Sequence, residues 1–253
     1  MDSNLKRLFP LFVKSLADAE LIDNIDFNGL QIFSEPKKAD YFFDSRKIIC
    51  EQKSLDNSML KKFEKEINAI ISSKRVRIYG RLSIDAILDR FKDSESLKQR
   101  VFNKLTKSIE GSFEAAHKQI KTTKEIFKLP HSKGILLILN ETSYLFSPSI
   151  LMRKVSGMFN KRTHAGNLRY REIVAAWIIQ FSHYTELKSK TKAFPTIKLL
   201  NNIGYSESDF EYVANYLETL EKEFADFLRM PYLTKTIEGT NFEPNKMPSI
   251  QIY

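Results

Sequence analysis

The sequence contains very little cysteine, glycine or proline, and each shortage excludes a class of protein. Cys50 is the only cysteine, so an intrachain disulfide and a zinc site built from several cysteines are both excluded. Glycine and proline occur 8 times each, too rarely for a low-complexity or disordered chain. A protein without structural disulfides suits a reducing compartment, and we therefore expect a cytoplasmic location.

Long apolar stretches are also missing. The longest ones, at 134–139 and 173–179, are far shorter than the roughly 20 residues that a membrane-spanning helix needs. The apolar stretch at 8–13 is broken by Pro10 and makes a poor signal peptide. These features predict a soluble protein with no membrane partner.

Several catalytic signatures do not occur either. The chain has no Gly-rich phosphate loop, no G-x-S-x-G nucleophile elbow and no H-E-x-x-H zinc motif. An ATPase, a Rossmann oxidoreductase and a serine hydrolase therefore have no support.

What the chain has in excess is positive charge, with a formal net charge of +9. This surplus suits a polyanionic partner such as nucleic acid, although a merely lysine-rich surface explains it equally well. Three basic clusters, with Phe159 and Tyr170 among them, could follow a phosphate backbone or form a solvated helix face. These clusters are Arg153-Lys154, Lys161-Arg162 and Arg169–Arg171.

The hydrophobic pattern of the first 148 residues predicts an α/β fold. Apolar side chains at helical spacing predict helices at 3–19, 57–72, 83–109 and 112–129. Extended patterns predict strands at 29–33, 39–43, 47–55 and 135–139. The last of these is apolar throughout, which is typical of a strand buried on both faces. The order of helix, three strands, helices and buried strand indicates an α/β sandwich with a mixed sheet.

The chain beyond Pro148 is predicted to be mainly helical. Helices are expected at 149–159, 170–184 and 207–227, although 173–181 is rich in β-forming residues and could be a strand. The segment 195–220 resembles a helix-turn-helix, but its second helix is acidic and suits a DNA groove badly, so an ordinary helical hairpin is the alternative. We therefore expect a core at 1–148, with a helical insertion at about 57–110, and a helical region at 149–253 packed on it.

A charged cluster lies on the hairpin formed by the second and third predicted strands. Glu51 and Lys53 are two positions apart on one strand, so their side chains share a face. If the hairpin turns at 44–47, Asp40 falls directly opposite Glu51, with Cβ atoms about 5 Å apart. A slip of one residue would move Asp40 to the other face.

Two opposed carboxylates repel each other unless a cation lies between them. A hard divalent ion with oxygen ligands is expected, namely Mg²⁺, with Mn²⁺ as a substitute. Such an ion would lower the pKa of a bound water, and Lys53 could orient that water or stabilise the transition state. The alternative is a solvated strand end with an incidental ion pair between Glu51 and Lys53.

The Glu-x-Lys pattern alone is weak evidence because it occurs three times. The occurrences are Glu35-Pro-Lys37, Glu51-Gln-Lys53 and Glu186-Leu-Lys188. The second follows an apolar strand and has an aspartate in the strand before it, and the other two lack this combination.

The pattern Ala39-Asp40, a spacer of ten residues and Glu51-Gln52-Lys53 resembles the signature of the PD-(D/E)XK nuclease superfamily, over roughly residues 3–140. The resemblance implies a restriction-endonuclease-like core of helix, three-stranded meander, helix and strand. It also implies that Asp40, Glu51 and the backbone carbonyl of Gln52 bind Mg²⁺, with Lys53 catalytic. Ala39 stands where the motif has proline.

The same resemblance suggests two further site residues. Many members add an acid from the first helix, for which Glu20 is the candidate metal ligand, with a surface glutamate as the alternative. Members often place a polar residue of the following helix near the site, and Gln119 is the candidate, with a solvated helix face as the alternative.

The expected function is Mg²⁺-dependent hydrolysis of phosphodiester bonds, with DNA as the nucleic-acid partner, and a homodimer is left open. The alternative is a catalytically inactive nucleic-acid-binding or interaction protein that has a nuclease-like fold.

Overall fold

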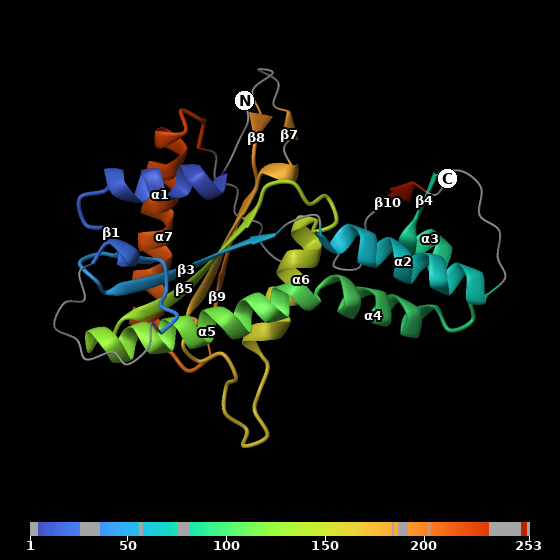
Figure 1. The fold of residues 1–253 in the computed structure, drawn as a ribbon, viewed down its shortest axis with the longest axis horizontal. Helices are drawn as coiled ribbons and strands as arrows, with labels where there is room; N and C mark the ends of the chain where they lie inside the picture. Colours follow the sequence, from blue (N-terminus) through green and yellow to red (C-terminus); the bar gives the residue numbers. More distant parts are fainter. Residues whose placement is uncertain are drawn as a thin grey trace.

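A mixed β-sheet with helices on both faces forms the body of the molecule, and a helical lobe extends from one side (Figure 1). The structure is a computed structural model that describes residues 5–25, 36–55, 58–74, 81–183, 185–186, 192–201, 203–232 and 249–251. Among these residues are seven α-helices and a six-stranded sheet. No helix in these ranges is long and apolar enough to cross a membrane.

The main sheet has the strand order β1-β2-β3-β5-β6-β9. These strands are β1 (Glu20–Leu21), β2 (Tyr41–Phe43), β3 (Ile48–Leu55), β5 (Lys133–Asn140), β6 (Ala175–Gln180) and β9 (Thr196–Leu200). The first three form an antiparallel meander, β3, β5 and β6 run parallel, and β9 returns antiparallel to β6. Parallel neighbours need crossover connections, which run through helices in this fold.

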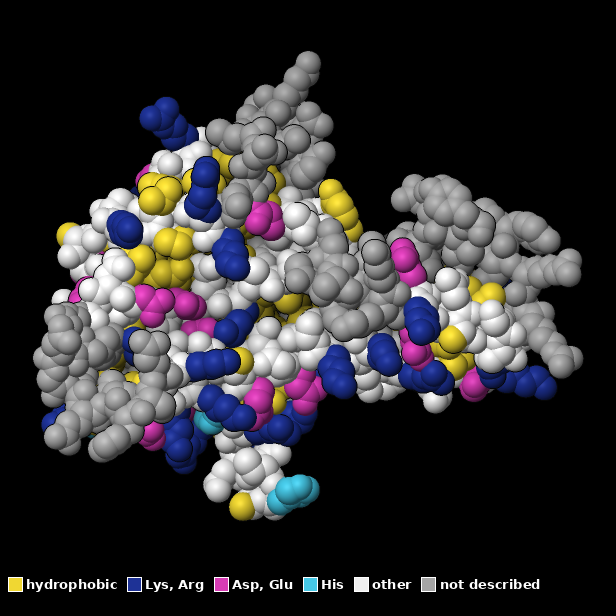
Figure 2. All heavy atoms as spheres, in the orientation of Figure 1, with side chains coloured by type: hydrophobic (Ala, Val, Ile, Leu, Met, Phe, Trp, Pro, Cys, Tyr) yellow, Lys and Arg dark blue, Asp and Glu magenta, His cyan; other side chains and the backbone are white. Residues whose placement is uncertain are grey.

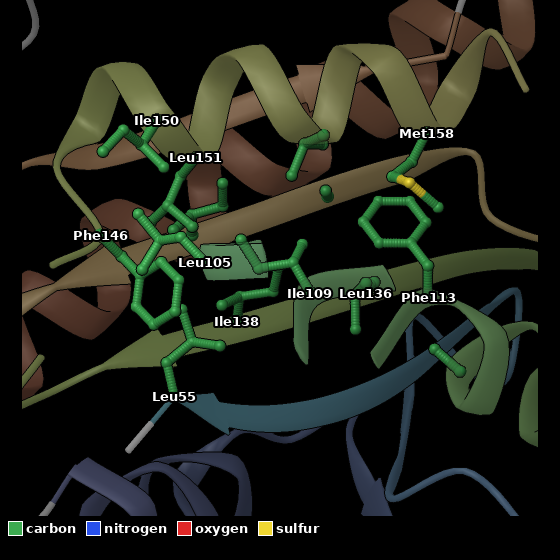
Figure 3. Packing of buried hydrophobic residues seen from close by; sticks show 14 of the residues in the cluster. Leu55, Leu105, Ile109, Phe113, Leu136, Ile138, Phe146, Ile150, Leu151 and Met158 are labelled. Atoms are coloured by element: carbon green, nitrogen blue, oxygen red, sulfur yellow. The ribbon is translucent and has the colours of Figure 1, made fainter. Parts of the chain in front are cut away.

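Each face of the sheet is covered by its own helices. One face packs against α1 (Leu5–Ser15) and α7 (Glu207–Phe227), and the other against α5 (Lys107–Phe127) and α6 (Pro148–Phe159). In β5, Leu136 and Ile138 point to the second face, while alternate residues point to the first. Figure 3 shows side chains of α6 pointing toward Ile138. Burial on both faces is why β5 is apolar throughout.

The helical lobe consists of α2 (Ser58–Ser73), α3 (Ile84–Leu88) and α4 (Ser94–Leu105). Apolar side chains of α2 and α4 join the hydrophobic cluster beneath α5, so the lobe packs continuously onto the core. A two-stranded sheet of β4 (Arg81–Ser83) and β10 (Ser249–Gln251) lies in the lobe. A second small ribbon joins β7 (Thr185–Glu186) to β8 (Lys192–Ala193), and 3-10 turns lie at Ile22–Asn24 and Phe181–His183.

Several sequence predictions are confirmed. The helices predicted at 3–19, 57–72, 112–129, 149–159 and 207–227 and the buried strand at 135–139 are all present. The hairpin strands predicted at 39–43 and 47–55 are also present. The charged helix predicted at 83–109 is instead divided between α3, α4 and the start of α5. The strand predicted at 29–33 lies outside the described residues.

The mainly helical C-terminal region is a wrong prediction. The segment expected as a helix at 170–184 contains β6, which confirms the alternative that 173–181 is a strand. The start of the segment 195–220 contains β9, so the helix-turn-helix interpretation is wrong. All six residues of β6 are buried, which removes the alternation that identifies a strand from sequence. The physical reason for the extra strands is that β5 would otherwise leave an unpaired apolar edge. The sheet therefore continues across the boundary expected at 148.

Gly134, at the start of β5, lies where another chain segment passes very close. A Cβ atom on Gly134 would be 2.0 Å from the backbone oxygen of Glu172 and 2.8 Å from a methyl carbon of Ile120. We expect Gly134→Ala to lower the free energy of unfolding by about 2 kcal/mol or more, because the backbone cannot yield without strain.

Urea denaturation of the purified chain measures this effect. The matched control is Gly111→Ala in α5, where a Cβ atom would meet nothing within 4 Å. That substitution should raise the free energy of unfolding by about 0.5–1 kcal/mol, because alanine favours helix more than glycine does. Equal effects of the two substitutions would contradict the packing at Gly134.

Candidate functional site

The hairpin of β2 and β3 has the register that the sequence predicts. Tyr41 pairs with Cys50, and the ladder continues toward a four-residue loop at 44–47. The amide of Lys47 donates to the carbonyl of Asp44 at 3.0 Å and closes this loop. Three successive loop residues have positive φ, between 46° and 70°, so the chain reverses within a very short distance.

Asp40 extends this ladder by one position. Its amide donates to the carbonyl of Cys50 at 3.1 Å, and its own carbonyl accepts from the amide of Ile22 at 3.0 Å. Its carboxylate accepts a hydrogen bond from the backbone amide of Gln52 at 2.7 Å. Asp40 is therefore fixed between the neighbouring strands, beside Glu51.

Glu51 is almost completely buried, with 1% of its surface exposed. One of its carboxylate oxygens, Oε1, accepts a hydrogen bond from the ammonium group of Lys53. The other, Oε2, is buried and has no hydrogen-bond partner. With both acids ionised, a buried carboxylate oxygen without a partner is energetically costly, and either a proton shared with Asp40 or a bound cation relieves this cost.

The electrostatics of the pair follow from this burial. Burial and then the neighbouring Asp40 carboxylate raise the pKa of Glu51 to about 8, although Lys53 opposes the shift. Burial also raises the pKa of Asp40, against the lowering effects of the Gln52 amide and Lys53. Two neighbouring carboxyl groups with raised pKa values are a setting that a bound cation would relieve.

The donor set fits a hard divalent ion such as Mg²⁺. Asp40 and Glu51 offer carboxylate oxygens, and a backbone carbonyl such as that of Gln52 is an oxygen ligand of the same kind. Within the described ranges, no group of three or more His, Cys, Asp or Glu side chains is arranged to hold a metal. Any ion here would therefore depend on two carboxylates together with backbone or water oxygens.

Gln119 of α5 lies beside Lys53. Its side-chain oxygen accepts from the Lys53 ammonium at 3.0 Å, and its side-chain nitrogen donates to the backbone carbonyl of Lys38 at 2.8 Å. Gln119 thus links the lysine to the segment just before Asp40. The structure brings together four residues that the sequence analysis selected: Asp40, Glu51, Lys53 and Gln119.

Thr123, one turn further along α5, was not selected from the sequence. Its hydroxyl is buried, accepts from the amide of Ala39 at 2.8 Å and donates to the carbonyl of Gln119 at 2.8 Å. Its spacing of four residues from Gln119 places both on one helix face, which is the signal that could have indicated it.

Glu20 does not join this group. It lies in β1 instead of at the end of the first helix, and its carboxylate accepts two hydrogen bonds from Arg46, at 2.8 and 2.6 Å. Among the described residues, Glu20 does not form a metal-binding group with Asp40 and Glu51. The acid nearer the site is Asp23, whose negative charge contributes to raising the pKa of Asp40. Sequence reasoning missed Asp23 because β1 was not predicted.

The raised pKa of Glu51 predicts a pH-dependent stability in the absence of divalent ions. The folded chain keeps a proton on Glu51 that the unfolded chain releases near pH 4.5, so stability is lost as pH rises toward 8. Between about pH 5 and 8, the free energy of unfolding should fall by about 1 kcal/mol per pH unit more steeply than in Glu51→Gln.

Urea denaturation in EDTA, at a series of pH values, measures both proteins. The glutamine variant keeps the size of the side chain and cannot titrate. Parallel pH profiles for the two proteins would show that Glu51 ionises normally.

The chain was compared with protein-family models, with curated proteins and with solved structures, and none of the three comparisons finds a match.

Proposed function

We propose that this chain is a metal-dependent nuclease that hydrolyses phosphodiester bonds, with DNA as its substrate. The observation that carries the proposal is the meeting of Asp40, Glu51 and Lys53 around a buried carboxylate oxygen that has no partner. Such an oxygen is stabilised when a cation binds it.

The order of the elements supports a restriction-endonuclease-like core. Helix α1, the meander of β1, β2 and β3, the crossover through α5 and the parallel strand β5 follow one another in the order that the PD-(D/E)XK resemblance implies. In this arrangement Asp40 precedes the second strand, and Glu51 and Lys53 lie on the third.

Asp40, Glu51 and the carbonyl of Gln52 would hold the Mg²⁺ ion in this proposal. When bound, the ion supplies a Lewis acid that neutralises phosphate charge and lowers the pKa of a water. Burial of Glu51 keeps bulk water away from its carboxylate, which strengthens the attraction of this group for a cation.

Lys53 supplies the positive charge of the site. Its ammonium lies between Glu51 and Gln119, and both contacts restrict where that charge can be. A fixed ammonium stabilises negative charge that develops on phosphate oxygens, because it needs no reorganisation during the reaction. Gln119 acts on the reaction only through Lys53 and is a positioning residue.

A second candidate is a nucleic-acid-binding protein that has the fold and lacks catalysis. The contact that favours it is the ion pair of Lys53 with Glu51, which occupies one of the oxygens that a metal would use. Both candidates predict DNA binding, and cleavage distinguishes them.

The test is cleavage of plasmid and linear DNA in Mg²⁺ or Mn²⁺. We expect activity that EDTA abolishes and that Lys53→Ala lowers by at least about 100-fold, because a preorganised charge is lost from the transition state. The matched control is Lys47→Ala, which removes an exposed lysine from the turn of the same hairpin.

The control should cleave DNA at nearly the wild-type rate. Asp40→Asn should also be inactive, and its urea denaturation shows whether the hairpin remains folded. Wild-type protein that binds DNA but cleaves none in either metal would establish the second candidate. Equal activity of Lys53→Ala and wild type would contradict the catalytic role of this site.

A further inference from the structure

Much of the chain's excess charge is concentrated in one segment, residues 148–172. This segment has six Lys or Arg side chains and one acid, Glu172. Its part at 160–171, which we term the basic arm, contains no acid. Positive charge that is concentrated in this way indicates a polyanionic partner.

The basic arm is an ordered hairpin that projects from the body of the molecule (Figures 1 and 2). A bridge joins Arg162 to Leu168, and the amide of Arg169 donates to the carbonyl of Lys161 at 2.9 Å. At the tip, the amide of Thr163 donates to the carbonyl of Asn167 at 2.8 Å, and Gly166 has a φ of 80°. These bonds fix the arm before any partner binds, which reduces the entropy lost on binding.

The base of the arm is held by α5. Lys161 pairs with Glu110, and Arg169 pairs with Glu114 at 3.3 Å. Other lysine and arginine side chains gather along the lower edge of the molecule beside the arm, over α5 and α4, with acids interspersed (Figure 2). The arm therefore belongs to a larger basic surface.

Two arginines of the arm remain directed to solvent. Arg162 is exposed, and its side chain donates to the carbonyl of Gly166 at 2.9 Å, which uses one of its five N–H groups. Arg171 contacts Glu172 at 3.3 Å while 67% of its side chain is exposed. A guanidinium with donors left over binds phosphate oxygens in a bidentate manner.

The arm also shows which form of nucleic acid suits it. Surfaces for single strands stack bases on exposed aromatic rings. The tyrosine of the arm, Tyr170, is 2% exposed and packs against Phe113. The arm exposes no Phe, Tyr or Trp ring, and its exposed ring is the imidazole of His164, so charge outweighs stacking on its surface. Such a hairpin suits the phosphate backbone of a duplex, which needs charge and not stacking.

We propose that the basic arm binds the phosphate backbone of duplex DNA. The choice of DNA as the duplex rests on the proposed nuclease function. The argument that the arm binds a phosphate backbone is independent of that function. Arm and candidate site share one support, because Arg169 is paired with Glu114 and Lys53 is bonded to Gln119 on the same helix. Those two α5 residues are separated by about 7.5 Å along the axis.

The experiment measures fluorescence anisotropy of a labelled 30-base-pair duplex with the full chain in EDTA, where no cleavage occurs. The test variant is Arg162→Ala with Arg171→Ala, which leaves the anchoring pairs of Lys161 and Arg169 intact. We expect its dissociation constant to rise about 10-fold or more. The slope of log affinity against log salt should fall by about 2, one for each lost phosphate contact.

The matched control removes two exposed lysines from the opposite face of the sheet, with Lys14→Ala on α1 and Lys222→Ala on α7. It loses the same charge, and its affinity should stay within about twofold of wild type. Equal affinity and salt slope of wild type and the arm variant overturn the proposal. Tighter arm-dependent binding of a single strand than of the duplex overturns it as well.

The two proposals fail separately. If duplex binding depends on the two arginines but the chain cleaves no DNA, the arm proposal is supported and the nuclease proposal is wrong. If the chain cleaves DNA and its affinity for the duplex does not depend on Arg162 and Arg171, the arm proposal is wrong and the nuclease proposal stands.

Discussion

The candidate site depends on the burial of one carboxylate. Glu51 lies in the third strand of a meander, under α5, where little water reaches it. Burial raises the free energy of the charged form of Glu51, and the Asp40 carboxylate raises it further. Lys53 offsets only part of this cost. This unbalanced arrangement distinguishes the cluster from most of the other ion pairs among the described residues, which lie at the surface and contribute little to stability.

The surrounding fold maintains this arrangement from three directions. The β1–β2–β3 meander places Asp40, the parallel strand β5 fixes β3 from the other side, and α5 lies across both. On α5, Gln119 and Thr123 reach down to the residues that flank Asp40. Bonds between segments about 80 residues apart in sequence therefore set the geometry of a hairpin that is otherwise local.

The hairpin register could be predicted from the sequence because side chains alternate strictly between the two faces of a strand. With Glu51 and Lys53 on one face, few alignments of β2 against β3 place Asp40 on that same face. Helix α7 could be predicted because acids follow its cap, Ser206, and an apolar stripe runs through it. The strand β6 could be predicted only as an alternative to a helix, because its β-forming residues indicate a strand while complete burial conceals the alternating pattern. Thr123 could be suspected only from its spacing of four residues from Gln119, and no sequence pattern reveals that its hydroxyl meets the amide of Ala39, 84 residues away.

The pairing of β4 with β10 has a consequence for biosynthesis. β4 belongs to the helical lobe and is translated before β5, β6 and β9 of the main sheet, whereas its partner strand β10 is translated after them. During synthesis, the edge of β4 therefore remains unpaired until β10 has been made. Open strand edges invite intermolecular association, so this edge is a point of misassembly for the nascent chain.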